Sequence, residues 1–525
     1  MKYILTIFLV FNLQLQAQTS ATISLNTSAV WSEIDSAFVG FSFNPAYIGM
    51  NFSSNYNAND DRTITKNLFN NFYPFQQPSI RINGANNSYW KNTNFNNAPS
   101  VFNANASVFN CTYCPSGSPS FSTAIDVNDL NDVQSFTNSL SYKPNLFWGI
   151  NMTYIDTARV ADFCNNITTR FSNNSNVKFE LGNEPDAYVS NNRRLNGYDI
   201  PAYVSEFNFT ANKVKNFGSI TGASFAKPNP SSSTSWADSI QYIINNIQSN
   251  NVSAISYHTY PLGSASSGTV SGFLNKYLSD VYSNDEVKNY TTGLFSSIKS
   301  TQQSGLSFRL GETNTISSGG LQGASDVMGS ALWAVDLMFE LAKIKGAGVN
   351  FAIEGSSTAY YSPFTFNSSQ VASGKKVLVN PLYYGCLLFA RAAQNKAHII
   401  SNSLTNVLGN PNIKVWSVVD KNNVLRVVII NRGNSITDNT IGSFILSLPN
   451  NNSNATLYTL SGDSSPSISS NAVTLSGQKV DQNTGLLIGS LSTSSISPNN
   501  GLYSVNVAAG SIALIEVTNA GCNCN

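Results

Sequence analysis

Residues 177–185, with the sequence VKFELGNEP, carry the clearest structural signal in this chain. The segment 177–181 is mostly apolar, as in a buried β-strand, and the Gly-Asn-Glu-Pro sequence that follows ends the strand. A carboxylic acid, Glu184, is therefore left at the C-terminal end of a strand. The sequence FRLGET at 308–313 has the same form and carries Glu312 at its end. Parallel α/β folds place their functional side chains at such strand ends.

Short apolar strands of this kind recur along the first three quarters of the chain, separated by segments long enough for a helix. This alternation is typical of β/α units, so we predict an α/β fold that closes into a (β/α)8 TIM barrel. An open doubly wound sheet is the alternative, but it would bring a glycine-rich phosphate-binding turn, and no G-x-G-x-x-G or Walker sequence is present. The predicted strands cover 37–43, 79–83, 146–151, 177–183, 219–225, 252–258, 306–312 and 349–354.

The pattern changes near residue 385, where one helix over 387–393 is followed by strands at short spacing with Asn, Ser and Gly turns between them. Such spacing is typical of a β-sandwich. We therefore predict a catalytic barrel over 19–384 and a β-sandwich over 385–525, which an early strand at about 21–25 could join. The sandwich strands are predicted at 413–419, 425–431, 443–448, 456–460, 472–475 and 511–517.

The N-terminus resembles a targeting segment. A lysine at position 2, an apolar stretch over 3–15 and small residues near position 17 predict a signal peptide over 1–18, with an uncleaved signal anchor as the alternative. We therefore expect a secreted protein, located outside the cell or in a lysosome-like compartment. The most apolar later stretch, 324–344, contains Asp336 and Glu340 among its charges, which predicts an amphipathic helix rather than a membrane span.

The amino-acid composition indicates which classes of molecule the protein can bind. Of the 525 residues, 42% are hydrophobic and 11% aromatic, so a large core can form. Only 11% are charged and the net charge is +1, which disfavours a nucleic-acid partner. A surface of Asn, Ser and Thr with many aromatic side chains suits a carbohydrate partner.

The cysteines and asparagines point to an extracellular protein. The chain has six cysteines, with Cys111 and Cys114 in a C-x-x-C sequence and a last pair at 522 and 524. A zinc site would need further ligands close by, and the chain has two histidines, so we expect structural disulfides or free thiols and no metal or organic cofactor. Many N-x-S/T sequences predict glycosylation, among them those at Asn105, Asn208 and Asn289.

The two strand-terminal glutamates are the catalytic candidates. In a barrel, Glu184 on the fourth strand and Glu312 on the seventh can flank one bond. Glycosidic cleavage needs such a pair, because one carboxyl group protonates the departing oxygen while the other meets the oxocarbenium-like carbon. Capping a helix or pairing with an arginine is the structural alternative for each. Asn183 is placed to donate to a sugar 2-hydroxyl, whereas Glu180 is expected to lie deeper in a structural pair, and Glu354 ends the eighth strand.

Aromatic residues at the end of the sixth strand extend the candidate site. Tyr257, His258 and Tyr260 would lie on the same rim, where aromatic faces stack on sugars and a tyrosine hydroxyl can orient a carboxylate. Packing at the top of the barrel is the alternative for these residues. The second histidine, His398, is interpreted as structural. A serine hydrolase is disfavoured because G-x-S-x-G is absent.

Together, LGNEP at 181–185 and LGET at 310–313 resemble the corresponding motifs of glycoside hydrolase family 79, the family of heparanase and microbial β-glucuronidases. YHTY at 257–260 and PLYY at 381–384 add to the resemblance. It implies a (β/α)8 barrel with a C-terminal β-domain, a retaining mechanism, Glu184 as the general acid/base and Glu312 as the nucleophile.

The resemblance also implies a site for the carboxylate of glucuronic acid, formed by backbone amides after the nucleophile and by a later tyrosine. Here these would be Ser318, Gly319 and Gly320, with Tyr383 or Tyr384. Consecutive small residues let amides converge on an anion, although a flexible Ser-Gly turn is the alternative. Heparanase has Tyr-Gly-Gly in this loop where the present chain has Ser317, Ser318 and Gly319, which leaves recognition of a neutral sugar open.

We therefore predict a secreted, retaining, exo-acting β-glucuronidase that releases glucuronic acid from glycans or glycoconjugates. One alternative is a heparanase-like endo-β-glucuronidase, which the near-neutral charge disfavours because its substrate is densely anionic. A related glycosidase for neutral β-linked sugars is another. A barrel that binds carbohydrate without cleaving it is the non-enzymatic alternative.

Overall fold

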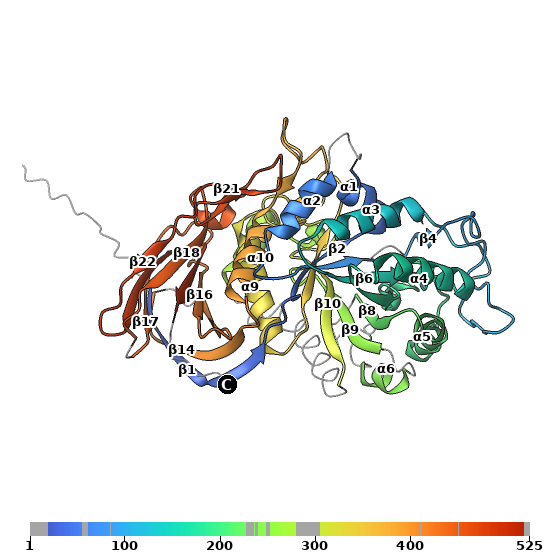
Figure 1. The fold of residues 1–525 in the computed structure, drawn as a ribbon, viewed down its shortest axis with the longest axis horizontal. Coiled ribbons are helices and arrows are strands. Elements are labelled where there is room, and N and C mark those ends of the chain that lie inside the picture. Colours follow the sequence, from blue (N-terminus) through green and yellow to red (C-terminus); the bar gives the residue numbers. More distant parts are fainter. Residues whose placement is uncertain are drawn as a thin grey trace, which may run out of the picture.

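The computed structural model describes residues 19–54, 61–83, 86–226, 236, 240–247, 252–279, 305–409, 412–449 and 451–518. The expected signal peptide over 1–18 and the cysteines at 522 and 524 lie outside the described residues. Figure 1 shows an α/β barrel on one side, a β-rich domain on the other, and the helices α9 (Met328–Lys343) and α10 (Pro381–Ala392) between them.

Eight parallel strands close into a barrel in the order β10-β11-β2-β3-β6-β7-β8-β9, so the predicted (β/α)8 fold is confirmed. Every predicted barrel strand is present within a few residues of its expected position. The strands are β2 (Val39–Phe43), β3 (Ser79–Ile82), β6 (Asn145–Ile150), β7 (Asn176–Leu181), β8 (Ser219–Phe225), β9 (Val252–Thr259), β10 (Ser307–Thr313) and β11 (Val349–Ile353).

Helices surround the barrel, and aspartates begin several of them. Asp156 accepts a hydrogen bond from a first-turn amide of α4, Asp199 does the same for α5, and Asp126 forms a capping box with Asp129 at α3. Such caps satisfy amides that a helix start leaves unpaired. The helices are α1 (Ile48–Phe52), α2 (Asp61–Asn70), α3 (Val127–Ser139), α4 (Thr157–Phe171), α5 (Ile200–Val214), α6 (Ile240–Asn246) and α7 (Val270–Leu278), followed by α9 and α10.

The expected amphipathic helix over 324–344 corresponds to α9, but one of its charged residues, Asp336, does not contact water. Asp336 is fully buried, accepts from Trp416 Nε1 over 2.9 Å and pairs with Arg432 Nη2 over 2.6 Å. The expected solvent exposure was wrong for Asp336 because the β-rich domain covers this face of α9. No helix in the described part of the chain is both long and apolar enough to cross a membrane.

The β-rich domain is one curled sheet of ten strands in the order β19-β18-β24-β16-β15-β14-β1-β17-β23, with β22 beside β18. The first described strand, β1, lies in this sheet between β14 and β17, antiparallel to the former and parallel to the latter. The strands are β1 (Ser20–Glu33), β14 (His398–Leu408), β15 (Ile413–Val419), β16 (Leu425–Asn431), β17 (Ile441–Ser447), β18 (Ala455–Gly462), β19 (Val473–Leu475), β22 (Ser494–Ile496), β23 (Leu502–Ala508) and β24 (Ser511–Val517).

The central strands of this sheet are buried on both faces. Along β16, Val427 and Ile429 point into the core of the β-rich domain, while Val428 and Ile430 join the core that extends into the barrel. Alternate residues of a strand point to opposite faces, so one strand supplies both cores. The barrel and the β-rich domain are therefore packed together through a continuous apolar layer.

Short two-stranded ladders complete the described structure. They are formed by β4 (Ser88–Trp90) with β5 (Thr123–Ile125), β12 (Phe364–Thr365) with β13 (Leu378–Val379), and β20 (Lys479–Val480) with β21 (Leu487–Ile488).

Candidate active site

A buried arginine, Arg81, lies at the centre of the C-terminal end of the barrel. It comes from β3 and its side chain is 1% exposed. Its guanidinium group donates to Glu180 over 2.6 Å, to Glu312 over 3.0 Å and to Asn183 Oδ1 over 3.1 Å, and it lies 3.0 Å from His258 Nε2. One cation thus fixes side chains from three other strand ends. Sequence reasoning had assigned no role to Arg81.

Glu180 is the structural partner of Arg81, as its deep position on β7 suggested. It also accepts hydrogen bonds from Ser256 Oγ and Asn83 Nδ2, each over 2.7 Å. Burial would raise the pKa of Glu180, but the charge of Arg81 and these hydrogen bonds outweigh it and lower the pKa to about 2. Glu180 is therefore a permanent counter-ion of Arg81.

Glu312 lies at the end of β10, with its side chain 17% exposed. Tyr260 donates to Oε1 over 2.7 Å and Arg81 to Oε2 over 3.0 Å. Burial would raise the pKa of Glu312, but the charge of Arg81 and the hydrogen bonds from Tyr260 and Arg81 lower it below its ordinary value. A carboxylate that is ionised and has both oxygens oriented suits a nucleophile.

Glu184 follows β7 at the turn into a short 3-10 helix, Pro185–Ala187. Its backbone is left-handed, with φ of 53°, and its N–H donates to the Ser224 carbonyl over 2.9 Å. Left-handed residues other than glycine are uncommon and cluster at functional sites. The side chain is 29% exposed, more than that of Glu312, and its Oε1 lies 3.0 Å from His258 Nδ1. Glu184 is thus the carboxyl group with better access to solvent protons.

The tautomer of His258 follows from its two contacts. A guanidinium N–H can only donate, so Nε2, at 3.0 Å from Arg81, must accept and Nδ1 must carry the proton that is donated to Glu184. Burial and Arg81 lower the pKa of His258, whereas Glu312 and Glu184 raise it and prevail in sum. We assign the neutral ring because protonation of Nε2 would break the contact with Arg81.

The two glutamates lie close together. One oxygen of Glu184, one oxygen of Glu312 and one nitrogen of His258 all lie within 4.8 Å of one another. Such a group could ligate a metal ion, but Arg81 already places a cation against both Glu312 and His258, which opposes a second cation. The short separation instead resembles the carboxyl pair of retaining glycosidases, which are about 5–5.5 Å apart.

A cleft of about 660 Å³ opens above this group. It includes Glu184, Glu312, Tyr260, Ser318 and Gly319 of the expected site residues. Sequence reasoning missed Tyr361 and gave Glu354 no role in binding, yet both face the cleft. The described lining is Glu184, Ala226, Tyr260, Gly263, Ser264, Glu312, Ser317, Ser318, Gly319, Glu354, Ser356, Thr358 and Tyr361.

The Ser-Gly loop forms part of the cleft wall in a defined conformation. Ser318 and Gly319 are left-handed, with φ of 61° and 89°. A Cβ atom at Gly319 would lie 2.6 Å from the Thr358 carbonyl oxygen, so this close approach requires glycine. Tyr361 N–H donates to the Gly319 carbonyl over 3.1 Å. The loop is therefore shaped by the residues that follow β11 and is not an isolated surface turn.

Gly320 and Tyr257, two of the expected binding residues, do not line the cleft. Gly320 is buried where a Cβ atom would lie 2.7 Å from Ser325 Oγ. Tyr257 is fully buried and packs against Phe225 and Phe308, with ring centroids 5.6 and 5.5 Å apart. Alternate side chains of a strand point to opposite faces, so Tyr257 must point out of the barrel when its neighbour His258 points in.

Tyr383 and Tyr384 also lie away from the cleft, on α10. Tyr383 Oη donates to the Leu68 carbonyl over 2.7 Å, and Tyr384 Oη accepts from Val480 N–H over 2.9 Å. Both tyrosines fasten α10 to neighbouring elements. Besides Tyr260, the described tyrosine that lines the cleft is Tyr361, which follows β11. Its closeness in sequence to Glu354, at the end of the eighth strand, is the signal that could have located it.

Asn183 is oriented by Arg81. Because a guanidinium donates, the carboxamide oxygen faces Arg81 and Nδ2 is the group left for another acceptor. The backbone carbonyl of Asn183 accepts from Asn86 Nδ2 over 2.9 Å, which steadies the chain next to Glu184. Asn183 is not among the described residues that line the cleft, and its donation to a sugar hydroxyl stays a prediction.

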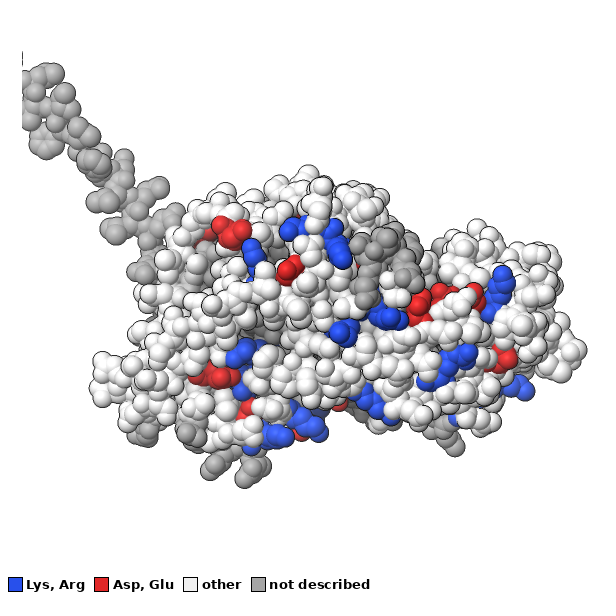
Figure 2. Space-filling view, turned by 45° about the horizontal axis from the view of Figure 1, so that its top comes forward, with Lys and Arg blue, Asp and Glu red and all other residues white. Residues whose placement is uncertain are grey.

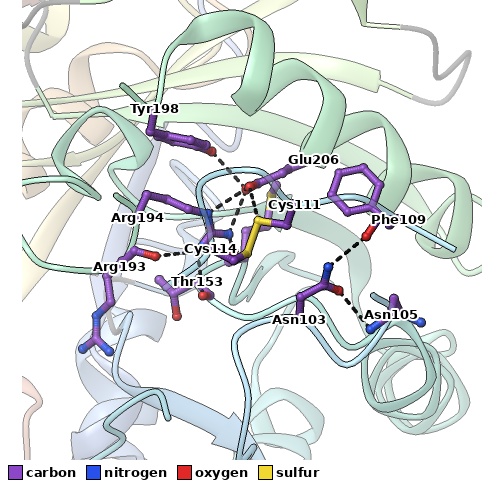
Figure 3. Close-up of a disulfide and its surroundings, with 11 residues drawn as sticks. Asn103, Asn105, Phe109, Cys111, Cys114, Thr153, Arg193, Arg194, Tyr198 and Glu206 are labelled. Carbon is purple, nitrogen blue, oxygen red and sulfur yellow. Dashed lines mark hydrogen bonds and ion pairs between the residues drawn. A yellow bond between two sulfur atoms is a disulfide. The ribbon is translucent and has the colours of Figure 1, made fainter. Parts of the chain in front are cut away.

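A second buried arginine supports the segment that follows Glu184. Figure 3 shows Arg194 and Tyr198 converging on Glu206 of α5, beside the Cys111–Cys114 disulfide. Arg194 donates to both carboxylate oxygens, over 2.9 and 2.8 Å, and Tyr198 donates over 3.0 Å. The two cysteines of the C-x-x-C sequence, Cys111 and Cys114, are thus bonded to each other.

Comparison with known proteins gives the fold but no family. No family model matches the chain, and no curated protein sequence is significantly similar to it. Among solved structures, it resembles a 4-O-α-L-rhamnosyl-β-D-glucuronidase from Fusarium oxysporum 12S with a TM-score of 0.68 at 16% identity, covering 94% of this chain and 100% of that chain.

Two further solved structures also match nearly end to end. One is a GH51 α-L-arabinofuranosidase from Thermotoga petrophila RKU-1, with a TM-score of 0.62 at 12% identity over 95% of this chain and 100% of that one. The other is the catalytic domain of a GH30 xylanase C from Talaromyces cellulolyticus, with a TM-score of 0.51 at 13% identity over 95% and 100%. At such low identity, the likeness establishes the shared barrel with its β-rich domain.

Proposed function

We propose that this protein is a retaining glycoside hydrolase in which Glu312 is the nucleophile and Glu184 the general acid/base. The observation that carries the proposal is the pair itself: two carboxyl groups within 4.8 Å, one held ionised by Arg81 and Tyr260 and the other open to solvent. Different environments for two carboxylates are what double displacement requires.

The reaction follows from these positions. Glu312 attacks the anomeric carbon while Glu184 gives its proton to the departing glycosidic oxygen, which leaves a glycosyl ester on Glu312. Glu184, now ionised, takes a proton from water, and the resulting hydroxide attacks the same carbon and frees Glu312 with overall retention. His258 Nδ1–H donates to Glu184 and stabilises its ionised form between the two steps.

The finer proposal is an exo-acting β-glucuronidase. Ser318, Gly319 and Tyr361 all line the cleft, and the backbone amides of consecutive small residues, together with a phenol, are groups that can bind a sugar carboxylate. The likeness to a β-D-glucuronidase structure supports this choice. Neutral β-linked sugars remain the second candidate, because three glutamates and no Lys or Arg are among the described cleft residues.

Endo-cleavage of a densely anionic polymer is not favoured. Figure 2 shows, on the face in view, basic and acidic side chains of the described residues scattered over a largely uncharged surface, whereas a densely sulfated chain would favour a strongly basic one. We further propose that the enzyme acts outside the cell, since the Cys111–Cys114 disulfide is typical of oxidising compartments.

Hydrolysis of chromogenic β-glucuronide, β-glucoside and β-xyloside by the purified protein and its Glu312→Gln variant tests the proposal. We expect one or more substrates to be turned over by the native protein, with a loss of about 10³-fold or more in the variant. NMR of the first-formed product should show the β-anomer. Turnover that survives in Glu312→Gln, or an inverted product, would refute the mechanism, and binding without turnover would favour the non-catalytic alternative.

A further inference from the structure

The charge of the cleft depends on a third carboxyl group. Glu354, at the end of the eighth barrel strand, lines the cleft together with Glu184 and Glu312, and no Lys or Arg is among the described lining residues. Arg81 lies beneath, 1% exposed, with its N–H groups directed to Glu180, Glu312 and Asn183. Unlike Glu312, Glu354 has no ion pair with a basic side chain among the described residues.

Glu354 is held in place by the segments that follow two adjacent strands. Its backbone N–H donates to Ser362 Oγ over 3.0 Å, and its carboxyl group accepts a hydrogen bond from the Asn44 side chain after β2. Asn44 Oδ1 accepts from Ala46 N–H over 3.0 Å, which fixes the carboxamide so that its NH₂ group faces Glu354. The side chain therefore has a fixed position at the cleft wall.

The groups around Glu354 determine its ionisation. Glu312 on β10 is the charged neighbour, Tyr361 follows β11, Asn44 follows β2, and His258 and Arg81 lie deeper, in contact with Glu184 and Glu312. Burial and then the negative charge of Glu312 raise the pKa of Glu354 to about 7, against the hydrogen bond from Asn44. The group can therefore change charge within the range in which the enzyme is expected to work.

Given the glycosidase function proposed above, on which this step rests, we propose that Glu354 determines which sugar the cleft accepts. As a neutral acid it donates to a sugar oxygen and tolerates the carboxylate of a uronic acid. As a carboxylate it accepts from sugar hydroxyls and repels a uronic acid, so that an uncharged pyranose is preferred.

Repulsion between like charges is the physical basis of this assignment. A like charge within about 4–6 Å of a carboxylate destabilises both charges by an amount that corresponds to a shift of about one pKa unit or more. A glucuronide and a glucoside differ in having a carboxylate or a CH₂OH group at one carbon, so the repulsion acts on one substrate and spares the other. Discrimination by a repulsive charge is a common device of specific sites.

The test is the ratio of kcat/KM for a chromogenic β-glucuronide to that for the matching β-glucoside, measured from pH 5 to pH 8.5. Glu184 and Glu312 serve both substrates, so their titrations cancel in this ratio, whereas that of Glu354 does not. We expect the ratio to fall about tenfold or more with rising pH in the native protein. In Glu354→Gln it should vary by less than about twofold.

Asp326→Asn is the matched control. Burial also raises the pKa of Asp326, but this residue lines a separate cavity with Tyr360 and Lys479, so its neutralisation should leave the falling ratio unchanged. If the native protein cleaves the glucoside alone, Glu354→Gln should raise glucuronide turnover at least about tenfold at pH 8.

A flat ratio in the native protein overturns the inference, and it does so even if Glu354→Gln fails to fold. A ratio that still falls in folded Glu354→Gln also overturns it, as does the absence of any gain in glucuronide turnover in the glucoside-only case. These outcomes leave catalysis intact. Failure of the proposed function is different: no glycoside is cleaved, or Glu312→Gln keeps its activity.

Discussion

Tyr260 Oη donates to Glu312 Oε1 over 2.7 Å, while Arg81 donates to the other oxygen of the same carboxylate. The two donors come from β3 and from the segment after β9, so the orientation of Glu312 depends on barrel strands that are distant in sequence. Burial strongly raises the pKa of Tyr260, and the adjacent Glu312 adds to this effect, so the phenol keeps its proton and donates.

Replacing Tyr260 with phenylalanine removes one of these hydrogen bonds and keeps the ring. We expect kcat/KM to fall about 10–100-fold, the loss of one charge-assisted hydrogen bond. The pKa of Glu312 should rise because a bond to its ionised form is lost, so the acid limb of the pH profile should move to higher pH. A lower rate with an unmoved limb would mean that Tyr260 contacts the substrate instead.

The pH dependence of kcat/KM should show activity extending into acid. The pKa of Glu312 is lowered from its ordinary 4.5, so the carboxylate persists as pH falls and is lost when pH passes through the lowered value. We therefore expect the acid limb below pH 4.5 on a substrate with an uncharged sugar. A limb above pH 5 in the folded protein would contradict the stabilisation of ionised Glu312 by Arg81 and Tyr260.

Replacing Arg81 with methionine should damage both folding and activity. The change leaves Glu180 buried without its cation, which costs about 3–5 kcal/mol of unfolding free energy. The double variant Arg81→Met/Glu180→Gln removes the buried charge as well and should recover part of this stability in urea denaturation. It should not recover activity, because Glu312 still lacks the hydrogen bond and the charge of Arg81. Recovery of activity would show that Arg81 acts through stability alone.

Glu184→Ala should affect substrates according to their leaving groups. Without the acid, a glycoside with a poor leaving group should lose about 10³-fold or more in rate, whereas an aryl glycoside with an acidic phenol should keep its first step and accumulate the glycosyl-enzyme. Mass spectrometry of the intact protein should detect this adduct. Equal losses for both leaving groups would contradict the assignment of Glu184 as the acid.

The Cys111–Cys114 disulfide and the Arg194–Glu206 ion pair, which both lie beside the segment after Glu184, should contribute unequally to the unfolding free energy. Cys111 and Cys114 are three positions apart, so their disulfide closes a short loop and its replacement by two serines should cost little unfolding free energy. Arg194→Met leaves Glu206 buried and unpaired and should cost about 3–5 kcal/mol. Thermal unfolding of both variants tests this order. A larger loss for the serine pair would reverse it.

The barrel could be predicted because its strands are buried on both faces and therefore appear as nearly continuous apolar segments. Glu184 and Glu312 could be located for a related reason, since a strand followed by a glycine and an acid marks a strand end. The β-rich domain was predicted less completely. β14 contains many Ser and Asn residues and β23 has alternate exposed positions, so neither has a strong apolar signal.

Contacts between side chains of different strands could not be predicted from the sequence. Arg81 and Tyr361 lie far from Glu312 along the chain, and their roles depend on barrel closure and loop packing. The alternation of side chains along β9 could have been used in the prediction. Because His258 faces inward, its neighbour Tyr257 must face outward. Tyr383 was misplaced because sequence similarity to a family motif does not show which face of a helix meets the cleft.

The position of β1 in the sheet has a consequence for biosynthesis. This strand is synthesised before the barrel, whereas its neighbours β14 and β17 follow the barrel in the sequence. Until then both of its edges are unpaired, and unpaired edges invite association with other chains. We therefore expect a fragment that stops after the barrel to leave both edges of this strand unpaired and to associate more readily than the full chain.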